Sequence, residues 1–536
     1  MQKSLEINKT FFKQRQYWQE IGVSLPKFEY EVVKQNSIKN PTWIHFGVGN
    51  IFRGFVARLQ QDLLNQQKAD TGILGVLTSD TSAIDFFKIY DNITLLVTLN
   101  FDGSVQRELI ASLTNIFHYQ LDYQRLIEVF LNPSLQIVSF TITEKGYNLF
   151  DENGQLQQQV AKDVSGHPAK AEHTLSVVTA LLLQRYLHGQ HPISLLSLDN
   201  CSDNGDKLKV SILTIANLWI KKGFATKEFG LYLQDIDKVS YPLSMIDKIT
   251  PSPSKALQQE LKSLDIQNIS IFVSSRKTLM APFVNAEKAE YLCIEDSFAN
   301  GRPKLEFAGV YFADRKVVKQ VENMKVTTCL NPLHTALAVF GCLFGYKSIA
   351  EEMKDQELVK LIKKIGYDEG LKVVVDPQII DPKQFIDEVI ERRLPNPFIP
   401  DTPQRIAIDT SQKVGIRFGE TIKTYINKEL DTKMLVGIPL TLAGWLRYLL
   451  GVDDNLEKMI LSPDPMLDKL TALLSEIRLG DKKLSRRQLF VILSNKTIFG
   501  VDLYQANLGE KIEDYFEQMI EGKGAVRSTL IKYLKG

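Results

Sequence analysis

The sequence predicts an α/β protein in which a Rossmann-type dinucleotide-binding domain is followed by a mainly α-helical domain. Between Pro41 and about residue 316, short β-rich runs alternate with helical patterns, which is typical of a mainly parallel sheet. From residue 317 onward, apolar residues recur at helical spacing and alternating β-rich runs are scarce. We therefore expect an N-terminal extension over residues 1–40, the dinucleotide-binding domain over 41–316 and the helical domain over 317–536.

The elements of the first domain follow in order from these patterns. The expected strands are Trp43–Val48, Ile73–Thr78, Thr94–Leu99, Gln136–Thr143, Ile193–Leu198, Ile269–Val273 and Tyr291–Ile294. The expected helices between them include Arg53–Gln67, Gln124–Leu131 and Ala171–His188.

The second domain is expected to consist of helices. Its periodic segments are Leu333–Gly345, Ile349–Ile365, Pro382–Arg393, Gln404–Ile416, Pro439–Leu450, Met466–Ile477 and Lys511–Ile520. A proline-rich loop over residues 394–403 separates two of them.

Composition excludes several function classes. The chain carries 64 Lys and Arg against 63 Asp and Glu, so its net charge of +1 offers no electrostatic basis for bulk nucleic-acid or acidic-membrane binding. Its four cysteines are scattered and form no C-x-x-C pair, which argues against disulfides and against a metal site. The polar first residues lack the apolar core of a signal peptide, so we expect a cytoplasmic protein.

A glycine turn follows the first expected strand, in the segment WIHFGVGNIFRGF. Gly47 and Gly49 lie where backbone N–H groups at a helix start approach a pyrophosphate. The third glycine of the usual pattern is absent, and a plain structural turn is the alternative. We expect Gly47, Gly49, Asn50 and Arg53 to bind the cofactor.

An acidic residue, Asp80, ends the next expected strand. An acid at this position would hydrogen-bond the adenosine ribose hydroxyls and repel a 2′-phosphate, which favours NAD over NADP. An ordinary strand-end or helix-capping aspartate is the alternative interpretation.

The helical domain opens with a polar cluster in the segment ENMKVTTCLNPLHTALAVFG. Asn331 and Pro332 suit the N-cap and the first position of a helix, which places His334 in its first turn. The positive end of the helix dipole disfavours a charged imidazole there, and a neutral histidine can orient a substrate oxygen. Lys325 precedes this helix, and each of these residues taken alone can be structural.

These motifs together resemble the polyol-specific long-chain dehydrogenases, a family that includes mannitol 2-dehydrogenase, fructuronate reductase and tagaturonate reductase. The resemblance covers roughly residues 41–420 and rests on HFGVGNIFRG, TITEKGY, LSLDNCSDNG, SMIDKITP, CIEDSF, GRP, ExxK, NPLH and NPFIPDTPQRIAIDTSQK. It implies a metal-independent oxidoreductase that uses NAD or NADP and acts on a small polyol or sugar acid.

The resemblance also implies roles for single residues. Lys325 matches the general acid/base, Asn331 and His334 match the groups that hold the reacting oxygen, and the substrate-binding positions are Asn200, Asp247, Arg405 and Lys413. Lys325 and Asn331 are six residues apart, against five in family members, and we expect the extra residue to lie in a loop before the helix. The expected reaction is reduction of fructuronate to mannonate with NADH, and mannitol 2-dehydrogenase and tagaturonate reductase are the alternatives. A non-catalytic NAD- or sugar-binding protein is a further alternative.

Overall fold

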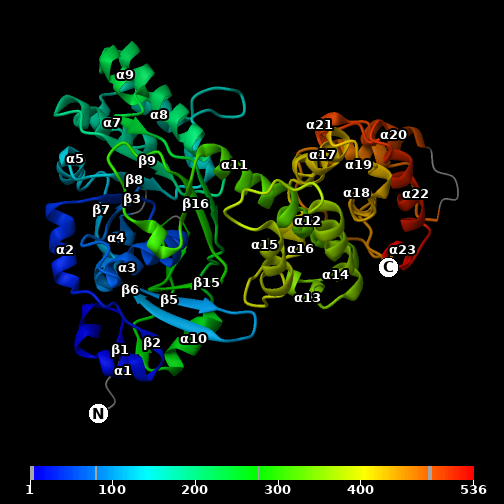
Figure 1. The fold of residues 1–536 in the computed structure, drawn as a ribbon, viewed down its shortest axis with the longest axis horizontal. Helices are drawn as coiled ribbons and strands as arrows, with labels where there is room; N and C mark the ends of the chain where they lie inside the picture. Colours follow the sequence, from blue (N-terminus) through cyan, green and yellow to red (C-terminus); the bar gives the residue numbers. More distant parts are fainter. Residues whose placement is uncertain (1–4, 79–80, 276, 481–485, 536) are drawn as a thin grey trace. The chain divides into compact units, whose positions relative to one another are not determined.

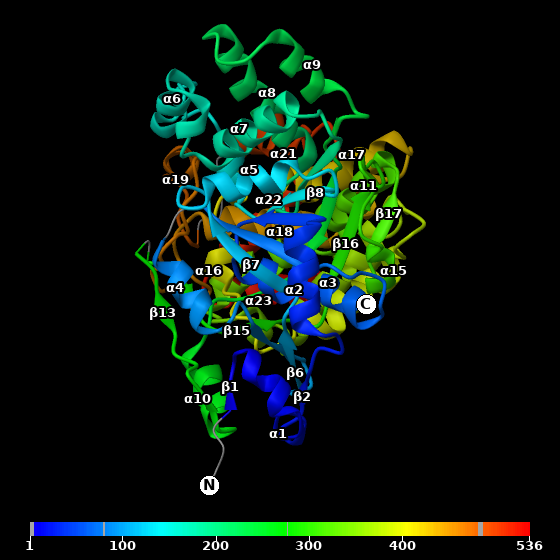
Figure 2. The ribbon, with the colours of Figure 1, turned by 90° about the vertical axis from the view of Figure 1, so that its left-hand side faces the viewer.

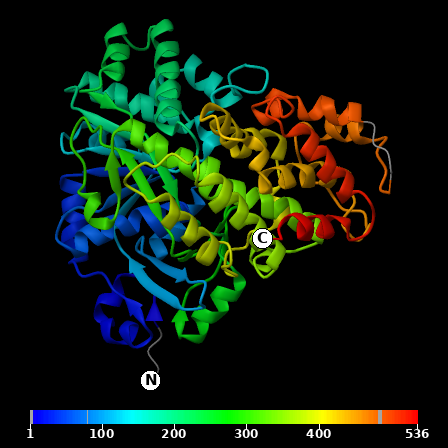
Figure 3. The ribbon, with the colours of Figure 1, turned by 45° about the vertical axis from the view of Figure 1, so that its right-hand side comes forward.

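The computed structural model describes residues 5–78, 81–275, 277–480 and 486–535. The chain forms two compact units, Met1–Val318 and Lys319–Gly536. The first unit is an α/β structure, and the second is built of helices, coloured green-yellow to red in Figures 1 and 3.

The main sheet of the first unit has six parallel strands in the order β10-β9-β8-β3-β4-β7. The strands are β3 (Trp43–Phe46), β4 (Ile73–Leu77), β7 (Leu113–His118), β8 (Ile137–Phe140), β9 (Ile193–Ser197) and β10 (Val239–Ser240). This is the order of the doubly wound dinucleotide-binding fold, so the expected Rossmann-type domain is confirmed. The strand order reverses between β3 and β8, and ligands of such sheets bind at the carboxyl ends of the strands on either side of that point.

Both faces of the main sheet are buried, because its strands are apolar at consecutive positions. Trp43 belongs to one hydrophobic core with helix α3 (Ala57–Asn65), whereas its neighbour Ile44 belongs to a second core. That second core includes α5 (Tyr123–Leu131), α7 (Thr174–Leu187) and α8 (Asn204–Lys221). The other helices of the unit are α1 (Arg15–Glu20), α2 (Tyr30–Lys39), α4 (Ser82–Ile89), α6 (Gln158–Ser165), α9 (Lys227–Gln234) and α10 (Lys255–Ser263).

The first unit also contains smaller sheets, so the expected strands do not all lie in the parallel main sheet. The strand expected at residues 94–99 is in a four-stranded sheet, and that expected at 291–294 is in a three-stranded sheet. The four-stranded sheet consists of β15 (Phe283–Ala286), β5 (Thr94–Leu99), β6 (Val105–Ile110) and β2 (Val23–Ser24), and the three-stranded sheet consists of β11 (Ser244–Asp247), β16 (Tyr291–Glu295) and β17 (Tyr311–Ala313). The physical reason is the short connection from β5 to β6, which permits an antiparallel hairpin and leaves no room for a crossover helix.

Two short strand pairs complete the unit. They are β1 (Leu5–Glu6) with β12 (Ile266–Gln267), and β13 (Phe272–Val273) with β14 (Leu279–Met280). Through β1 and β2 the N-terminal residues join the first unit, and β1 and α10 lie at the same end of it (Figure 2).

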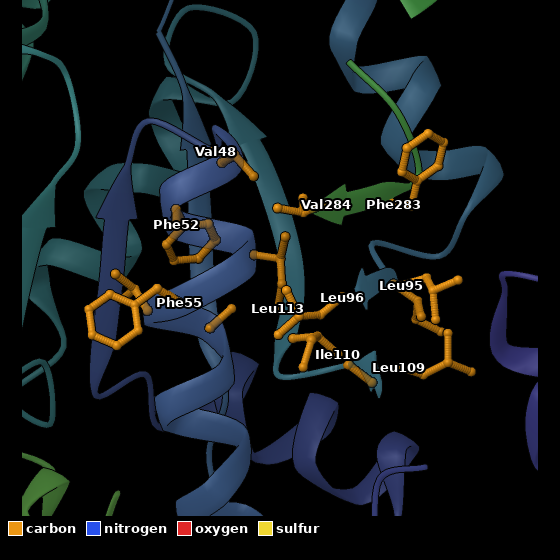
Figure 4. Close-up of a cluster of buried hydrophobic side chains, with 14 of the residues drawn as sticks. Val48, Phe52, Phe55, Leu95, Leu96, Leu109, Ile110, Leu113, Phe283 and Val284 are labelled. Carbon is orange, nitrogen blue, oxygen red and sulfur yellow. The ribbon is translucent and has the colours of Figure 1, made fainter. Parts of the chain in front are cut away.

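Gly54 sits in the helical segment that follows β3 and packs against the four-stranded sheet. A Cβ atom on Gly54 would lie 2.8 Å from a methyl carbon of Val284 in β15. Figure 4 shows Val48 and Val284 pointing toward one another in this core. Gly54 therefore provides the close helix–sheet packing that the third glycine of the usual fingerprint provides.

The second unit is centred on α12 (Asn331–Phe344) and α18 (Gly437–Tyr448), whose side chains are nearly all buried. Its other helical segments are η6 (Lys325–Cys329), α13 (Ile349–Glu352), α14 (Gln356–Lys363), η7 (Lys364–Gly370), α15 (Pro382–Glu388), η8 (Val389–Arg393), α16 (Pro403–Ile406), η9 (Thr410–Gln412), η10 (Gly415–Gly419), α17 (Glu420–Asn427), η11 (Thr432–Met434), α19 (Leu467–Leu474), α20 (Arg486–Leu493), α21 (Lys496–Phe499), α22 (Gly509–Met519) and α23 (Ala525–Tyr533). The run Arg315–Phe344, which begins with α11 (Arg315–Met324), is long and apolar enough to cross a membrane, but 78% of its most apolar window is buried, as in a core helix.

Candidate active site

A cavity of about 840 Å³ opens at the carboxyl ends of β3 and β8. Its walls come from the turn after β3, the end of β4, the loop after β8, the start of α7 and the β13–β14 hairpin. It is lined by four of the five residues expected to bind the cofactor, Gly47, Gly49, Asn50 and Arg53. The fifth, Asp80, lies outside the described residues.

Gly47 is held in place by the loop after β8. Its φ of 101° is one that side-chain-bearing residues rarely adopt, and a Cβ atom there would overlap the carbonyl oxygen of Thr141. The Thr141 hydroxyl donates a hydrogen bond of 2.8 Å to the Gly47 carbonyl oxygen. His45 Nε2 lies 3.1 Å from the same oxygen, and burial lowers the pKa of His45 to about 3, so this histidine is neutral.

Gly49 differs from Gly47, because no described atom lies within 4 Å of the position that its Cβ would take. Packing within the protein therefore does not require a glycine at position 49. The open space is on the cavity side of a helix start, where backbone N–H groups can approach a phosphate. The turn thus fits the pyrophosphate of a dinucleotide.

Arg53 and Asn50 form a hydrogen-bonded pair in the cavity wall. The Arg53 guanidinium donates hydrogen bonds to Asn50 Oδ1 at 2.9 Å and to the Ala281 carbonyl oxygen at 2.7 Å. Arg53 is only 2% exposed, and burial lowers its pKa to about 10. Its charge persists at neutral pH and favours an anionic group in the cavity.

The second unit places Lys325 on a helix, so the expected loop between Lys325 and the following helix is wrong. Lys325 begins the π-helical turn η6, which continues α11, and its side chain is only 3% exposed. A π-turn holds one more residue than an α-turn, so η6 takes the extra residue between Lys325 and Asn331. Leu330 alone separates η6 from α12.

Asn331 is the first residue of α12 rather than its N-cap, which corrects a second local expectation. Leu330 takes the cap position, and the Asn331 carbonyl oxygen accepts a hydrogen bond from the Thr335 hydroxyl at 2.9 Å. The Asn331 side chain is thus not required to cap the helix. His334 follows in the first turn of α12, as expected.

His334 lies in a charged environment. Its Nε2 atom is 3.6 Å from Asp401 Oδ2, and the same carboxylate forms an ion pair with Arg405. Burial lowers the pKa of His334 to about 4, an effect that Asp401 opposes and that Arg417, Arg405 and Arg393 reinforce. The imidazole is therefore neutral at physiological pH and can donate or accept a hydrogen bond.

Arg417, which sequence reasoning missed, is the unexpected member of this cluster. Its guanidinium is partly buried and donates a hydrogen bond of 2.5 Å to the Thr335 hydroxyl, one residue after His334. Burial lowers the pKa of Arg417 to about 10, and no carboxylate among the described residues pairs with it. The only available signal was its spacing of four residues from Lys413.

Lys413 completes the cluster of positive groups. Its ammonium donates a hydrogen bond to the Ile408 carbonyl oxygen, and its pKa is lowered by burial and by the nearby Arg417 charge. Four cations, Arg393, Arg405, Lys413 and Arg417, lie near His334 or near Lys413. The carboxylates of Asp401, Asp409 and Asp464 lie near the same two residues.

The two other predicted substrate residues belong to the first unit. Asn200 is exposed just after β9, and Asp247 is a buried residue at the end of β11. Neither is among the residues that line the 840 Å³ cavity. Within the described residues, no group of three or more His, Cys, Asp or Glu side chains is placed to hold a metal ion.

Comparison with known proteins identifies the family. The family model described as the mannitol dehydrogenase Rossmann domain matches residues 41–307, and that described as the mannitol dehydrogenase C-terminal domain matches residues 317–520. The chain belongs to the mannitol dehydrogenase family. Its expected class, an oxidoreductase with a Rossmann-type domain, is therefore confirmed.

Individual relatives span the whole chain. The D-mannonate oxidoreductase of Thermotoga maritima is 51% identical over 533 residues, which cover 98% of each chain. The structure of Pseudomonas fluorescens mannitol 2-dehydrogenase in ternary complex with NAD and D-mannitol matches with a TM-score of 0.71 at 27% identity, covering 99% of this chain and 100% of that one. A substrate-free D-sorbitol dehydrogenase shares the fold, with a TM-score of 0.77 at 22% identity over 95% of this chain and 97% of that one.

Proposed function

We propose that this protein catalyses the NAD-dependent interconversion of fructuronate and mannonate. The observation that carries the proposal is the partly buried Arg417 beside His334 and Lys413, without a carboxylate partner in the described part of the chain. A charge that is partly removed from water and has no partner carries a desolvation cost, and a ligand carboxylate would offset that cost by pairing with it. A hexuronate carries such a carboxylate, whereas a simple ketose or polyol does not.

Two comparisons support the details. The T. maritima relative named D-mannonate oxidoreductase, at 51% identity, supports a hexuronate substrate. The P. fluorescens relative that binds NAD supports NAD in the cavity of the first unit, whose glycine turn and buried Arg53 fit a pyrophosphate.

The residues of the second unit supply the remaining chemistry of a ketone reduction. NAD in its reduced form supplies the hydride. We assign to Lys325 the proton that neutralises the developing alkoxide, and the removal of that proton in the oxidation direction. Asn331 and the neutral His334 would hold the reacting oxygen by hydrogen bonds. Arg417, with Arg405 and Lys413, would hold the carboxylate, and Asn200 and Asp247 remain proposed substrate contacts of the first unit.

The cellular setting is part of the same proposal. A net charge of +1 offers no electrostatic basis for binding nucleic acid or an acidic membrane surface, and the proposed partner is a small sugar acid. We propose that the reaction takes place in the cytoplasm and needs no metal ion.

The test compares substrates in the wild type and in Arg417→Gln. We expect kcat/KM of the wild type to be highest for fructuronate, ahead of tagaturonate and fructose. Arg417→Gln should lower kcat/KM for fructuronate by about 100-fold, or about 2.7 kcal/mol, since a charge-assisted contact to the carboxylate is lost. The value for fructose should change far less.

Arg487→Gln is the matched control, because Arg487 is an exposed arginine of the second unit on α20. It should leave all three values unchanged. If the wild type has a kcat/KM for fructose that equals or exceeds that for fructuronate, the uronate proposal is refuted and a mannitol 2-dehydrogenase is favoured. If kcat/KM is highest for tagaturonate, the substrate is still a ketohexuronate, but the preferred epimer is tagaturonate.

A further inference from the structure

Asp199 joins the ends of two neighbouring strands of the main sheet. It follows β9, and its carboxylate accepts hydrogen bonds from the backbone of the loop after β8. Oδ1 accepts from the Thr143 N–H at 2.9 Å, and Oδ2 accepts from the Ile142 N–H at 2.9 Å. Because β8 and β9 are parallel neighbours, both segments lie at the same edge of the sheet, next to the cofactor cavity.

The carboxylate of Asp199 is itself held in orientation. The Tyr147 hydroxyl donates a hydrogen bond to Oδ2 at 2.6 Å and lies 2.7 Å from the Ser197 hydroxyl. The Asn204 side-chain amide donates to the Asp199 carbonyl oxygen at 3.0 Å. Tyr147 is 3% exposed, so this arrangement is anchored in the core of the first unit.

Thr143 has a backbone conformation that costs free energy. Its φ is 66° and its ψ is 159°, in a region that is essentially restricted to glycine and is especially unfavourable for a β-branched residue. Its side chain is exposed, and Thr143 lines the 840 Å³ cavity. Strain of this kind persists only where surrounding contacts enforce it, and it concentrates at ligand sites.

The same loop supports the glycine turn. Thr141, two residues before Thr143, donates its hydroxyl to the Gly47 carbonyl oxygen, and its own carbonyl packs against Gly47. Moving the backbone at residues 142 and 143 would therefore disturb both the cavity wall and the contact to the turn.

We propose that Asp199 is a positioning residue for the dinucleotide, which holds Thr143 in its strained conformation and thereby keeps the loop after β8 shaped for the cofactor. The proposal rests on the proposed function only in taking a nicotinamide dinucleotide as the cavity's ligand. In this proposal the backbone strain drives Thr143 out of the conformation that the cofactor needs, and the hydrogen bonds to Asp199 hold it there.

A double-mutant experiment separates this role from a general structural one. NADH affinity is measured by fluorescence titration for the wild type, Asp199→Asn, Thr143→Gly and the double variant, together with thermal unfolding. Asparagine has one acceptor oxygen for three donors, so Asp199→Asn should raise the NADH Kd about tenfold. Thr143→Gly alone should raise the unfolding temperature and keep the Kd within about threefold, because glycine adopts the conformation without strain.

The decisive variant is the double one. Glycine at position 143 adopts the conformation without the hydrogen bonds of Asp199. The NADH Kd of the double variant should therefore be at least about threefold lower than that of Asp199→Asn alone. A double variant that binds NADH no better than Asp199→Asn, or an Asp199→Asn variant that binds like the wild type, would overturn the proposal. An absence of NADH binding by the wild type would instead refute the proposed cofactor.

Asp454→Asn is the matched control. Asp454 is a buried aspartate of the second unit whose carboxylate likewise accepts two backbone N–H groups, those of Val526 and Arg527. Its substitution should lower the unfolding temperature and leave the NADH Kd unchanged. A tenfold rise of the Kd in this control would show that loss of any such carboxylate weakens binding, and would remove the case for Asp199.

Discussion

Glu352, in the second unit, is a buried glutamate whose protonation should control the pH dependence of stability. It lies at the end of α13, is fully buried, and neither of its carboxyl oxygens has a hydrogen-bond partner among the described residues. The carboxyl packs against α12 at Gly341, where a Cβ atom would overlap it. Burial, reinforced by the negative charges of Asp355 and Glu351, raises the pKa of Glu352 to about 9.

The size and sign of the effect follow from the difference between the folded and unfolded states. In the unfolded chain the carboxyl ionises near its ordinary pKa of 4.5, whereas the folded protein keeps it protonated to about pH 9. The contribution to stability is thus fully present below pH 4.5 and is lost progressively as the pH rises through about 9. Each pH unit costs about 1.36 kcal/mol, so about 3 kcal/mol is lost by pH 7.

Glu352→Gln removes this titration and keeps the shape of the protonated acid. We expect the variant and the wild type to have similar free energies of unfolding near pH 4.5, and the variant to be more stable by about 3 kcal/mol at pH 7. Calorimetry of the unfolding transition of the second unit at several pH values gives the free energy of unfolding of each protein. The titrations of all other groups cancel when the value for the wild type is subtracted from that for the variant. Glu521→Gln is the control, because Glu521 is an exposed glutamate of the second unit and is not among the charges that act on Glu352. Parallel pH profiles for wild type and Glu352→Gln would refute the reasoning.

The remaining predictions concern the cofactor and the proton transfer. Lys325→Ala should lower kcat by about 10² or more without changing the NADH Kd, and added small amines should restore part of the rate; near-normal turnover would point to another acid/base group. Asp80→Ala should lower the ratio of kcat/KM with NAD to kcat/KM with NADP by at least about tenfold. An unchanged ratio would mean that Asp80 does not bind the ribose. Gly49→Ala should raise the NADH Kd about tenfold at an unchanged unfolding temperature, since its Cβ meets only the open cavity. Gly47→Ala, measured beside it, should lower the unfolding temperature because its Cβ overlaps Thr141.

Local sequence patterns were sufficient for the elements that bury a regular apolar face. The turn between β3 and the following helix was predictable, because strand, glycine pair and amphipathic helix are contiguous in the chain. The helix that begins near Pro332 was predictable for the same reason, although its cap was misplaced by one residue. The π-turn at Lys325 was not predictable, because one extra residue can enter a loop or a widened helical turn at similar cost.

The sequence by itself determined the two-part architecture, the glycine turn and the family motifs around Lys325 and His334. Each of these features depends on residues that are close together in the chain. Only the tertiary structure brought Asp199 to Thr143, 56 residues away, and Arg417 to Thr335, 82 residues away. Contacts at such separations depend on how strands and helices pack, and no period or spacing in the chain specifies them. Tertiary packing likewise decides whether a polar group that is removed from water finds a partner, which is why Arg417 and Glu352 became informative only in the folded protein.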